Sequence, residues 1–201
     1  MSKTLDYYLA LASPWTYLAG PRLDALIKRN QLAVNVKPFD LMRIFAMIGT
    51  KIVRERPAQI QRNRLNELRR WRDHLGMKLT LEPKFFPVDQ KPASRVVIAA
   101  IEAGADGLAL SSRVLEAVWA EERDIADRDT LAAIVKKAGL DAKAVLAKAD
   151  SPEIAAVFER NTEDAIANHV FGSPTWIFAG ELFWGQDRLE FLSRAVERAA
   201  A

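Results

Sequence analysis

The pattern of apolar and polar positions at the start of the chain predicts a strand, a helix and a second strand. Residues 5–11 form a short apolar run, which is typical of a strand. Ser13 and Pro14 follow, and these residue types favour the N-cap and the first position of a helix. Apolar residues then recur with helical spacing over 15–27, and 32–38 alternates as a strand does. This succession predicts two parallel strands joined by a right-handed crossover.

The remainder divides into a long helical stretch and a return to strands. Between residues 40 and 149 the apolar positions follow helical spacing, with Asp127 and Asp141 as expected N-caps and Gly76, Gly104 and Gly139 as stop signals. Strand signals return at 175–178 and 182–184 as a hairpin, and Asp187 is expected to cap a final helix. This order predicts an α/β thioredoxin-like fold interrupted by a large all-helical insertion. The expected domains are a thioredoxin-like domain of residues 1–39 and 150–201 and an inserted helical domain of residues 40–149.

The composition narrows the chemistry that the chain itself can supply. It has 201 residues, no cysteine, and only two histidines, His74 and His169. Without cysteine, any sulfur chemistry must come from a bound thiol. The two histidines lie far apart in sequence, so we expect no metal site. No apolar run reaches the roughly 18 residues of a membrane span, and residues 1–6 lack signal-peptide architecture. We therefore expect a cytoplasmic protein that does not enter membranes.

The positive charge is concentrated in one segment. The net charge is +3, but residues 51–72 carry eight Lys or Arg side chains against two Glu. Such a block is compatible with a solvated helix face, an anionic ligand or nucleic acid. Its one aromatic residue, Trp71, falls on the apolar stripe of the predicted helix, so a base-stacking platform is not expected. We therefore predict no nucleic-acid partner.

Two segments at the predicted helix and strand starts could bind a ligand. Ser13 begins the first helix, where free N–H groups favour an anion such as a thiolate; the simpler interpretation is an N-cap. Ser173 precedes Pro174 at the start of a strand. In a thioredoxin fold this proline is cis, which leaves the backbone N–H and C=O of Ser173 free to pair with an extended peptide; the simpler interpretation is a turn. Gln186 and Asp187 open the last helix, where a carboxylate normally caps its own backbone.

Five short motifs, taken together, resemble one family. They are Ser13-Pro14-Trp15-Thr16-Tyr17-Leu18, Glu67-Leu68-Arg69-Arg70-Trp71, Pro83-Lys84-Phe85-Phe86-Pro87, Phe171-Gly172-Ser173-Pro174-Thr175 and Trp184-Gly185-Gln186-Asp187-Arg188. In this order, and without cysteine, they resemble 2-hydroxychromene-2-carboxylate isomerase and its relatives, the kappa-class glutathione transferases. These proteins form part of the DsbA-like branch of the thioredoxin superfamily. The resemblance spans essentially the whole chain.

The resemblance implies a glutathione-dependent isomerase that acts on an aromatic carboxylate from ring degradation, and a homodimer. Ser13 would stabilise the glutathione thiolate, and Ser173 beside cis-Pro174 would pair with the cysteinyl unit. Gln186 and Asp187 would hold the γ-glutamyl end. The thiolate would add to the conjugated enone, allow rotation about the former double bond, and leave again. Trp15 and His169 are further candidates for the substrate-binding wall.

The chain departs from the family pattern mainly within the insertion. Thr50, Asn63, Glu67 and Asp89 stand where the family more often has other residues. In this family the insertion faces the substrate, so we expect the thiol side to be kept and the substrate side to differ. Two other functions stay open from the sequence: a kappa-like glutathione transferase or peroxidase, and a non-catalytic thiol-binding protein on the same fold.

Overall fold

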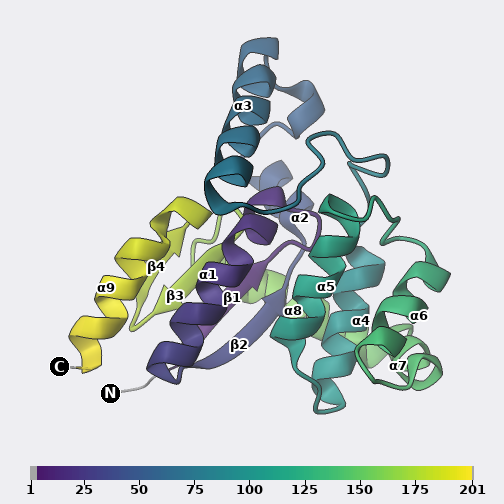
Figure 1. Cartoon of the computed structure of the whole chain (residues 1–201). Helices are drawn as coiled ribbons and strands as arrows, with labels where there is room; N and C mark the ends of the chain where they lie inside the picture. The colour runs from purple at the N-terminus through teal and green to yellow at the C-terminus, as the bar shows by residue number, and fades with distance from the viewer. Residues whose placement is uncertain (1–3, 201) are drawn as a thin grey trace.

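A four-stranded mixed sheet forms the centre of the structure. The structure is a computed structural model that describes residues 4–200, and its strands have the order β2-β1-β3-β4 (Figure 1). β1 pairs in parallel with β2 and antiparallel with β3, and β3 and β4 form an antiparallel hairpin. The expected parallel pair and the expected hairpin are both confirmed. The strands are β1 (Thr4–Leu9), β2 (Ala33–Pro38), β3 (Thr175–Phe178) and β4 (Glu181–Trp184).

Every regular element between β2 and β3 in the described chain is helical, as the pattern predicts. The predicted boundaries also hold. Asp127 and Asp141 cap their helices by accepting from the backbone N–H of Thr130 and Ala144, and Gly76 ends α3 with a left-handed φ of 62°. The helices are α1 (Pro14–Asn30), α2 (Leu41–Met47), η1 (Val53–Glu55), α3 (Ala58–Leu75), α4 (Lys91–Glu102), α5 (Gly107–Trp119), α6 (Arg128–Lys137), α7 (Ala142–Ala149), α8 (Pro152–Ala167), η2 (Gln186–Arg188) and α9 (Leu189–Ala200).

The two faces of the sheet are covered by different helices. Because successive side chains of a strand point to opposite faces, Tyr7 and Tyr8 enter separate hydrophobic clusters. Tyr7 stacks on Trp176, with ring centroids 5.8 Å apart, in the larger cluster, which also contains buried residues of α1, α4, α5 and α9. Tyr8 packs with Phe39 and with residues of α2 and α8. The insertion and the sheet therefore share one large core, and the division of the chain at residues 39/40 and 149/150 stays a prediction.

The start of the last helix differs from the prediction. Asp187 was expected as its cap but lies in the short turn η2, and its carboxylate pairs with Arg188. The reason is the backbone at Gly185, whose φ of 95° turns the chain between β4 and η2. A Cβ at Gly185 would lie 2.7 Å from Oδ1 of Asp187. Asp187 is therefore free of a capping role.

In the described residues, no helix is both long and apolar enough to cross a membrane. Figure 1 shows α3 projecting from the end of the molecule at which α1 begins. The candidate site lies at that start of α1.

Candidate active site

The hydroxyl of Ser13 joins the start of α1 to the loop before β3. Ser13 is 9% exposed, and its Oγ accepts from the Thr16 N–H at 3.3 Å, as an N-cap does. The same Oγ donates to the carbonyl oxygen of Ser173 at 3.2 Å. Both sequence interpretations therefore apply: Ser13 is an N-cap, and it also contacts the segment that the sequence marks as peptide-binding.

The Ser173 loop is held against this helix start by a second hydroxyl pair. The Ser173–Pro174 peptide bond is cis, as expected for the fold. The Oγ of Ser173 accepts from the backbone N–H of Ala10 at 2.8 Å and shares a hydrogen bond of 2.8 Å with Oγ1 of Thr16. The expectation that the C=O of Ser173 is free is wrong, because the Ser13 hydroxyl occupies it. Thr16 was not singled out from the sequence, since a threonine at this helix position carries no distinctive signal.

Two backbone donors remain available at this corner. Among the described residues, neither the N–H of Trp15 nor that of Ser173 donates to an acceptor. The Trp15 N–H belongs to the first turn of α1, where the helix dipole favours a negative charge. Together with the Ser13 hydroxyl, it forms a group of donors that can receive an anion such as a thiolate. The Ser173 N–H can pair with a peptide carbonyl.

Gln186 is fixed in one orientation by a cation. Its side chain is 3% exposed, and its Oε1 accepts from Nη2 of Arg22 on α1. The Arg22 guanidinium also lies over the ring of Trp71 on α3, 5.1 Å from the centroid. Because Oε1 faces the cation, the amide NH₂ of Gln186 is left to donate to a ligand. Arg22 was missed because its partners come from distant parts of the sequence.

Asp187 follows directly and supplies an acceptor beside this donor. Burial lowers the pKa of Arg22, and the nearby Asp187 carboxylate opposes that shift by stabilising the cation. The corner therefore presents an amide donor and a carboxylate side by side. This pair suits a ligand that carries both a carboxylate and an ammonium group.

The two further wall candidates occupy different environments. Trp15 is half-buried and packs against the large core cluster. His169 is exposed, with a left-handed φ of 59°, and its side chain forms no hydrogen bond in the described structure. A different aromatic residue lies beside the Ser173 loop: the indole of Trp184 packs on Gly172, where a Cβ would lie 2.1 Å from Nε1. Trp184 also contacts Phe171, with ring centroids 4.7 Å apart.

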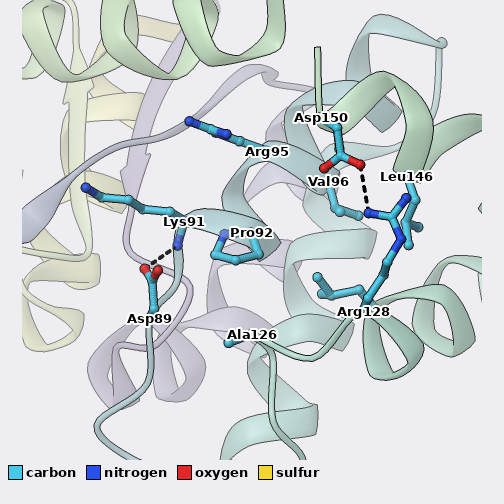
Figure 2. A pocket seen from close by; sticks show the side chains of 11 residues that line it. Asp89, Lys91, Pro92, Arg95, Val96, Ala126, Arg128, Leu146 and Asp150 are labelled. Atoms are coloured by element: carbon cyan, nitrogen blue, oxygen red, sulfur yellow. Dashed lines mark hydrogen bonds and ion pairs between the residues drawn. The ribbon is translucent and has the colours of Figure 1, made fainter. Parts of the chain in front are cut away.

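A cavity of about 420 Å³ lies elsewhere, between the start of α4, α6 and the end of α7 (Figure 2). Its rim includes the ion pair between Arg128 and Asp150, at 2.7 Å, and its wall includes the apolar Val96 and Leu146. None of the predicted site residues lines it. In the part of the chain that the structure describes, no three His, Asp or Glu side chains group together as metal ligands.

Comparison with known proteins agrees with the fold. The family model of the DSBA-like thioredoxin domain matches residues 4–197. The chain is 32% identical over 199 residues to 2-hydroxychromene-2-carboxylate isomerase of Pseudomonas putida, covering 96% of this chain and 94% of that protein. The isomerase of Sphingobium xenophagum is 28% identical, with coverages of 96% and 97%. A solved structure of selenomethionine-labelled 2-hydroxychromene-2-carboxylate isomerase superimposes with a TM-score of 0.83, at 28% identity and coverages of 98% and 96%.

A family match over almost the whole chain defines the class. The chain belongs to the DSBA-like thioredoxin family and, within it, to the branch that contains 2-hydroxychromene-2-carboxylate isomerase.

Proposed function

We propose that this protein is a glutathione-dependent isomerase of the 2-hydroxychromene-2-carboxylate type. The observation that carries the proposal is the placement of the Ser13 hydroxyl at the start of α1, against the loop of cis-Pro174, in a chain that has no cysteine. A thiol is the reactive group that this position accommodates in redox-active thioredoxin folds. Here the protein supplies only hydrogen-bond donors, so the thiol has to arrive with a cofactor.

The thiol, the cysteinyl backbone and the γ-glutamyl end of glutathione would each have a matching group in this corner. The thiolate would accept from the Ser13 hydroxyl, released from Ser173, and from the Trp15 N–H. The cysteinyl backbone would pair with the Ser173 N–H beside Pro174. The α-carboxylate of the γ-glutamyl end would accept from the Gln186 amide, and its ammonium group would donate to Asp187.

The proposed reaction is nucleophilic catalysis by this borrowed thiolate. The thiolate adds to the conjugated enone of the substrate, so that a carbon–sulfur bond forms and the double bond becomes single. Rotation about that bond follows, the carbon–sulfur bond breaks, and the double bond re-forms with the thiolate as leaving group. Glutathione is returned unchanged, and substrate and product are isomers.

Calorimetric titration with reduced glutathione tests the cofactor directly. We expect binding in the micromolar to millimolar range, and we expect Asp187→Ala to weaken it because the ammonium group loses its acceptor. Absence of binding to the wild-type protein up to high millimolar concentration contradicts the proposal.

The reaction itself separates this proposal from a transferase or peroxidase. An isomerase leaves the glutathione concentration constant while 2-hydroxychromene-2-carboxylate is converted, whereas a transferase or peroxidase consumes glutathione. A protein that only binds the thiol has no rate that Ser13→Ala can reduce.

A further inference from the structure

One cation of the basic segment is half-buried and has no counter-ion. Arg64 lies on α3, and its Nη2 is fully buried without a hydrogen-bond acceptor. In the described part of the chain, no carboxylate lies within ion-pair distance of its guanidinium. The acid three residues further along α3, Glu67, is paired with Arg70 instead. An unpaired buried charge is costly, so this arrangement needs a reason.

A second guanidinium makes the same position more positive. Arg56 lies just before α3, is half-buried, and donates its Nε to the backbone carbonyl of Lys51 at 2.9 Å. Burial and the neighbouring Arg56 charge lower the pKa of Arg64 to about 10, so Arg64 stays charged at neutral pH. The two like charges lie near enough to repel each other, and in the described chain neither forms an ion pair with a carboxylate.

Aromatic rings pack against the Arg64 guanidinium. The Arg64 guanidinium lies over the ring of Phe86, 5.2 Å from its centroid, and Phe86 packs on Trp119 with ring centroids 4.9 Å apart. A guanidinium over an aromatic ring gains a cation–π attraction, and its N–H groups still donate within the guanidinium plane. A planar carboxylate is the group that such a fork binds in bidentate fashion.

Arg64 shares one face of α3 with Trp71, which contacts Arg22 beside the proposed glutathione site of Ser13, Ser173 and Gln186 (the thiol corner). Arg64, Leu68 and Trp71 follow at spacings of four and three residues, which places them on one face of α3. Leu68 is fully buried, and Trp71 stacks on the Arg22 that holds Gln186. Seven residues of helix separate Arg64 from Trp71 by about 10 Å along the axis, which is the length scale of a small aromatic molecule.

We propose that Arg64, supported by Arg56, binds the carboxylate of the substrate, a small aromatic acid, above the thiol corner. This assignment rests on the proposed function for the identity of the substrate, while the carboxylate site itself rests on the unpaired guanidinium. The family pattern offers no guide here, because the neighbouring Asn63 and Glu67 are among the positions at which this chain departs from it.

Calorimetry with salicylate and salicylamide, without glutathione, tests the site. These probes differ only in whether the ring carries a carboxylate or an uncharged amide. We expect the wild-type protein to bind salicylate at least about tenfold more tightly than salicylamide, because hydrogen bonds to charged groups are the stronger ones. Arg64→Met should abolish this preference. Arg62→Met removes the same charge from an exposed side chain of α3 and should keep it.

Several results would overturn the assignment. These are equal binding of the two probes by the wild-type protein, no binding of salicylate, and a preference that survives Arg64→Met. Arg64→Lys guards against a folding defect, since it keeps a point charge without the fork and should retain part of the preference. Titration of the same proteins with glutathione separates the two proposals. A protein that fails to bind glutathione but shows the Arg64-dependent preference refutes the thiol cofactor and leaves the carboxylate site standing.

Discussion

Two helices of this chain begin with the same Ser-Pro pair, and only one pair contacts a distant segment. At the start of α8, Ser151 Oγ accepts from the N–H three residues later at 3.4 Å, much as Ser13 Oγ does at 3.3 Å. The Ser13 hydroxyl also donates to the Ser173 carbonyl, 160 residues away in the chain, whereas the Ser151 hydroxyl caps only the start of its own helix. The local sequence thus specifies the cap in both places, and the tertiary position of α1 beside cis-Pro174 creates the candidate site.

The largest expected difference is between Ser13→Ala and Ser151→Ala. If the Ser13 hydroxyl stabilises a bound thiolate, its removal should lower kcat/KM for isomerisation by about 100-fold or more. Ser151→Ala should leave the rate unchanged. Ser151→Ala should lose about 1 kcal/mol of unfolding free energy because it removes an N-cap, and Ser13→Ala should lose at least as much because the bond to Ser173 goes as well.

Rates and urea unfolding of both variants measure these effects. The ultraviolet absorbance of the bound thiolate adds an independent readout: Ser13→Ala should raise the pKa of bound glutathione, and Ser151→Ala should not. A Ser13→Ala protein with the wild-type rate and thiol pKa would restrict Ser13 to capping.

Thr16→Val gives the start of α1 an apolar residue at the position where α8 has one. The third residue after the serine is Thr16 in α1 and the apolar Ile154 in α8. Replacing Thr16 removes the hydroxyl that bonds Ser173 Oγ at 2.8 Å in a buried place. We expect a loss of about 1–3 kcal/mol in unfolding free energy, since a buried hydroxyl loses a partner. Urea unfolding measures it, and Ser112→Ala on the exposed face of α5 serves as control. A loss no larger than that of the control would contradict the role of Thr16 in holding the loop.

Part of the candidate site can be predicted from the sequence, and there is a physical reason why the rest cannot. Short-range signals specify the ends of elements, so the caps Ser13, Asp127 and Asp141 and the cis-Pro174 turn were all foreseen. Contacts between segments have no such signal. Thr16 and Arg22 therefore emerged only from the structure, as did the contact between the Ser13 hydroxyl and the Ser173 carbonyl.

Asp187 illustrates the opposite error. An acid two residues before an apolar stripe has the pattern of a cap, but Gly185 turns the chain so that a short 3₁₀ turn comes first. The outcome favours the binding role, because the carboxylate does not bond the helix backbone. That role stays a prediction until glutathione binding is measured.

Arg22 offers a test of the orientation of Gln186. In Arg22→Met the amide of Gln186 is free to turn, so glutathione affinity should fall about tenfold, the scale of one hydrogen bond to a charged group. Gln186→Glu keeps a partner for Arg22 but removes the NH₂ donor, so it should weaken glutathione binding similarly.

Cysteinylglycine, which lacks the γ-glutamyl unit, is the matched ligand. Its affinity should be the same in wild type and in both variants, as measured by calorimetry. A parallel loss for both ligands would show that Arg22 acts only by supporting the fold.

The smallest expected effect is on stability and concerns the ion pair between α8 and the sheet. Its Asp164 accepts from Lys37 and from the Tyr8 hydroxyl, both at 2.7 Å. An ion pair thus connects α8 to the sheet, whereas neutral hydroxyl groups connect α1 to the Ser173 loop. Burial raises the pKa of Asp164, but the hydrogen bonds from Lys37 and Tyr8 outweigh it and hold the pKa below its usual value of 3.8. A carboxyl group with a lowered folded-state pKa stabilises the protein above its unfolded pKa, and this contribution disappears as the pH falls through the folded value.

Asp164→Asn should therefore reduce stability at neutral pH by less than about 1 kcal/mol, because the pair is partly exposed and screened. The difference from wild type should begin to shrink below about pH 4, where the carboxyl group of the unfolded chain binds a proton, and should vanish below the lowered folded-state pKa. Thermal unfolding of both proteins between pH 3 and pH 7 measures this, with Ser13→Ala as the contrast: its stability loss should be the same across the range, because a hydroxyl does not titrate there. A pH-independent loss in Asp164→Asn would mean that α8 is held by packing alone, and the two helices would then differ less than their hydrogen bonds indicate.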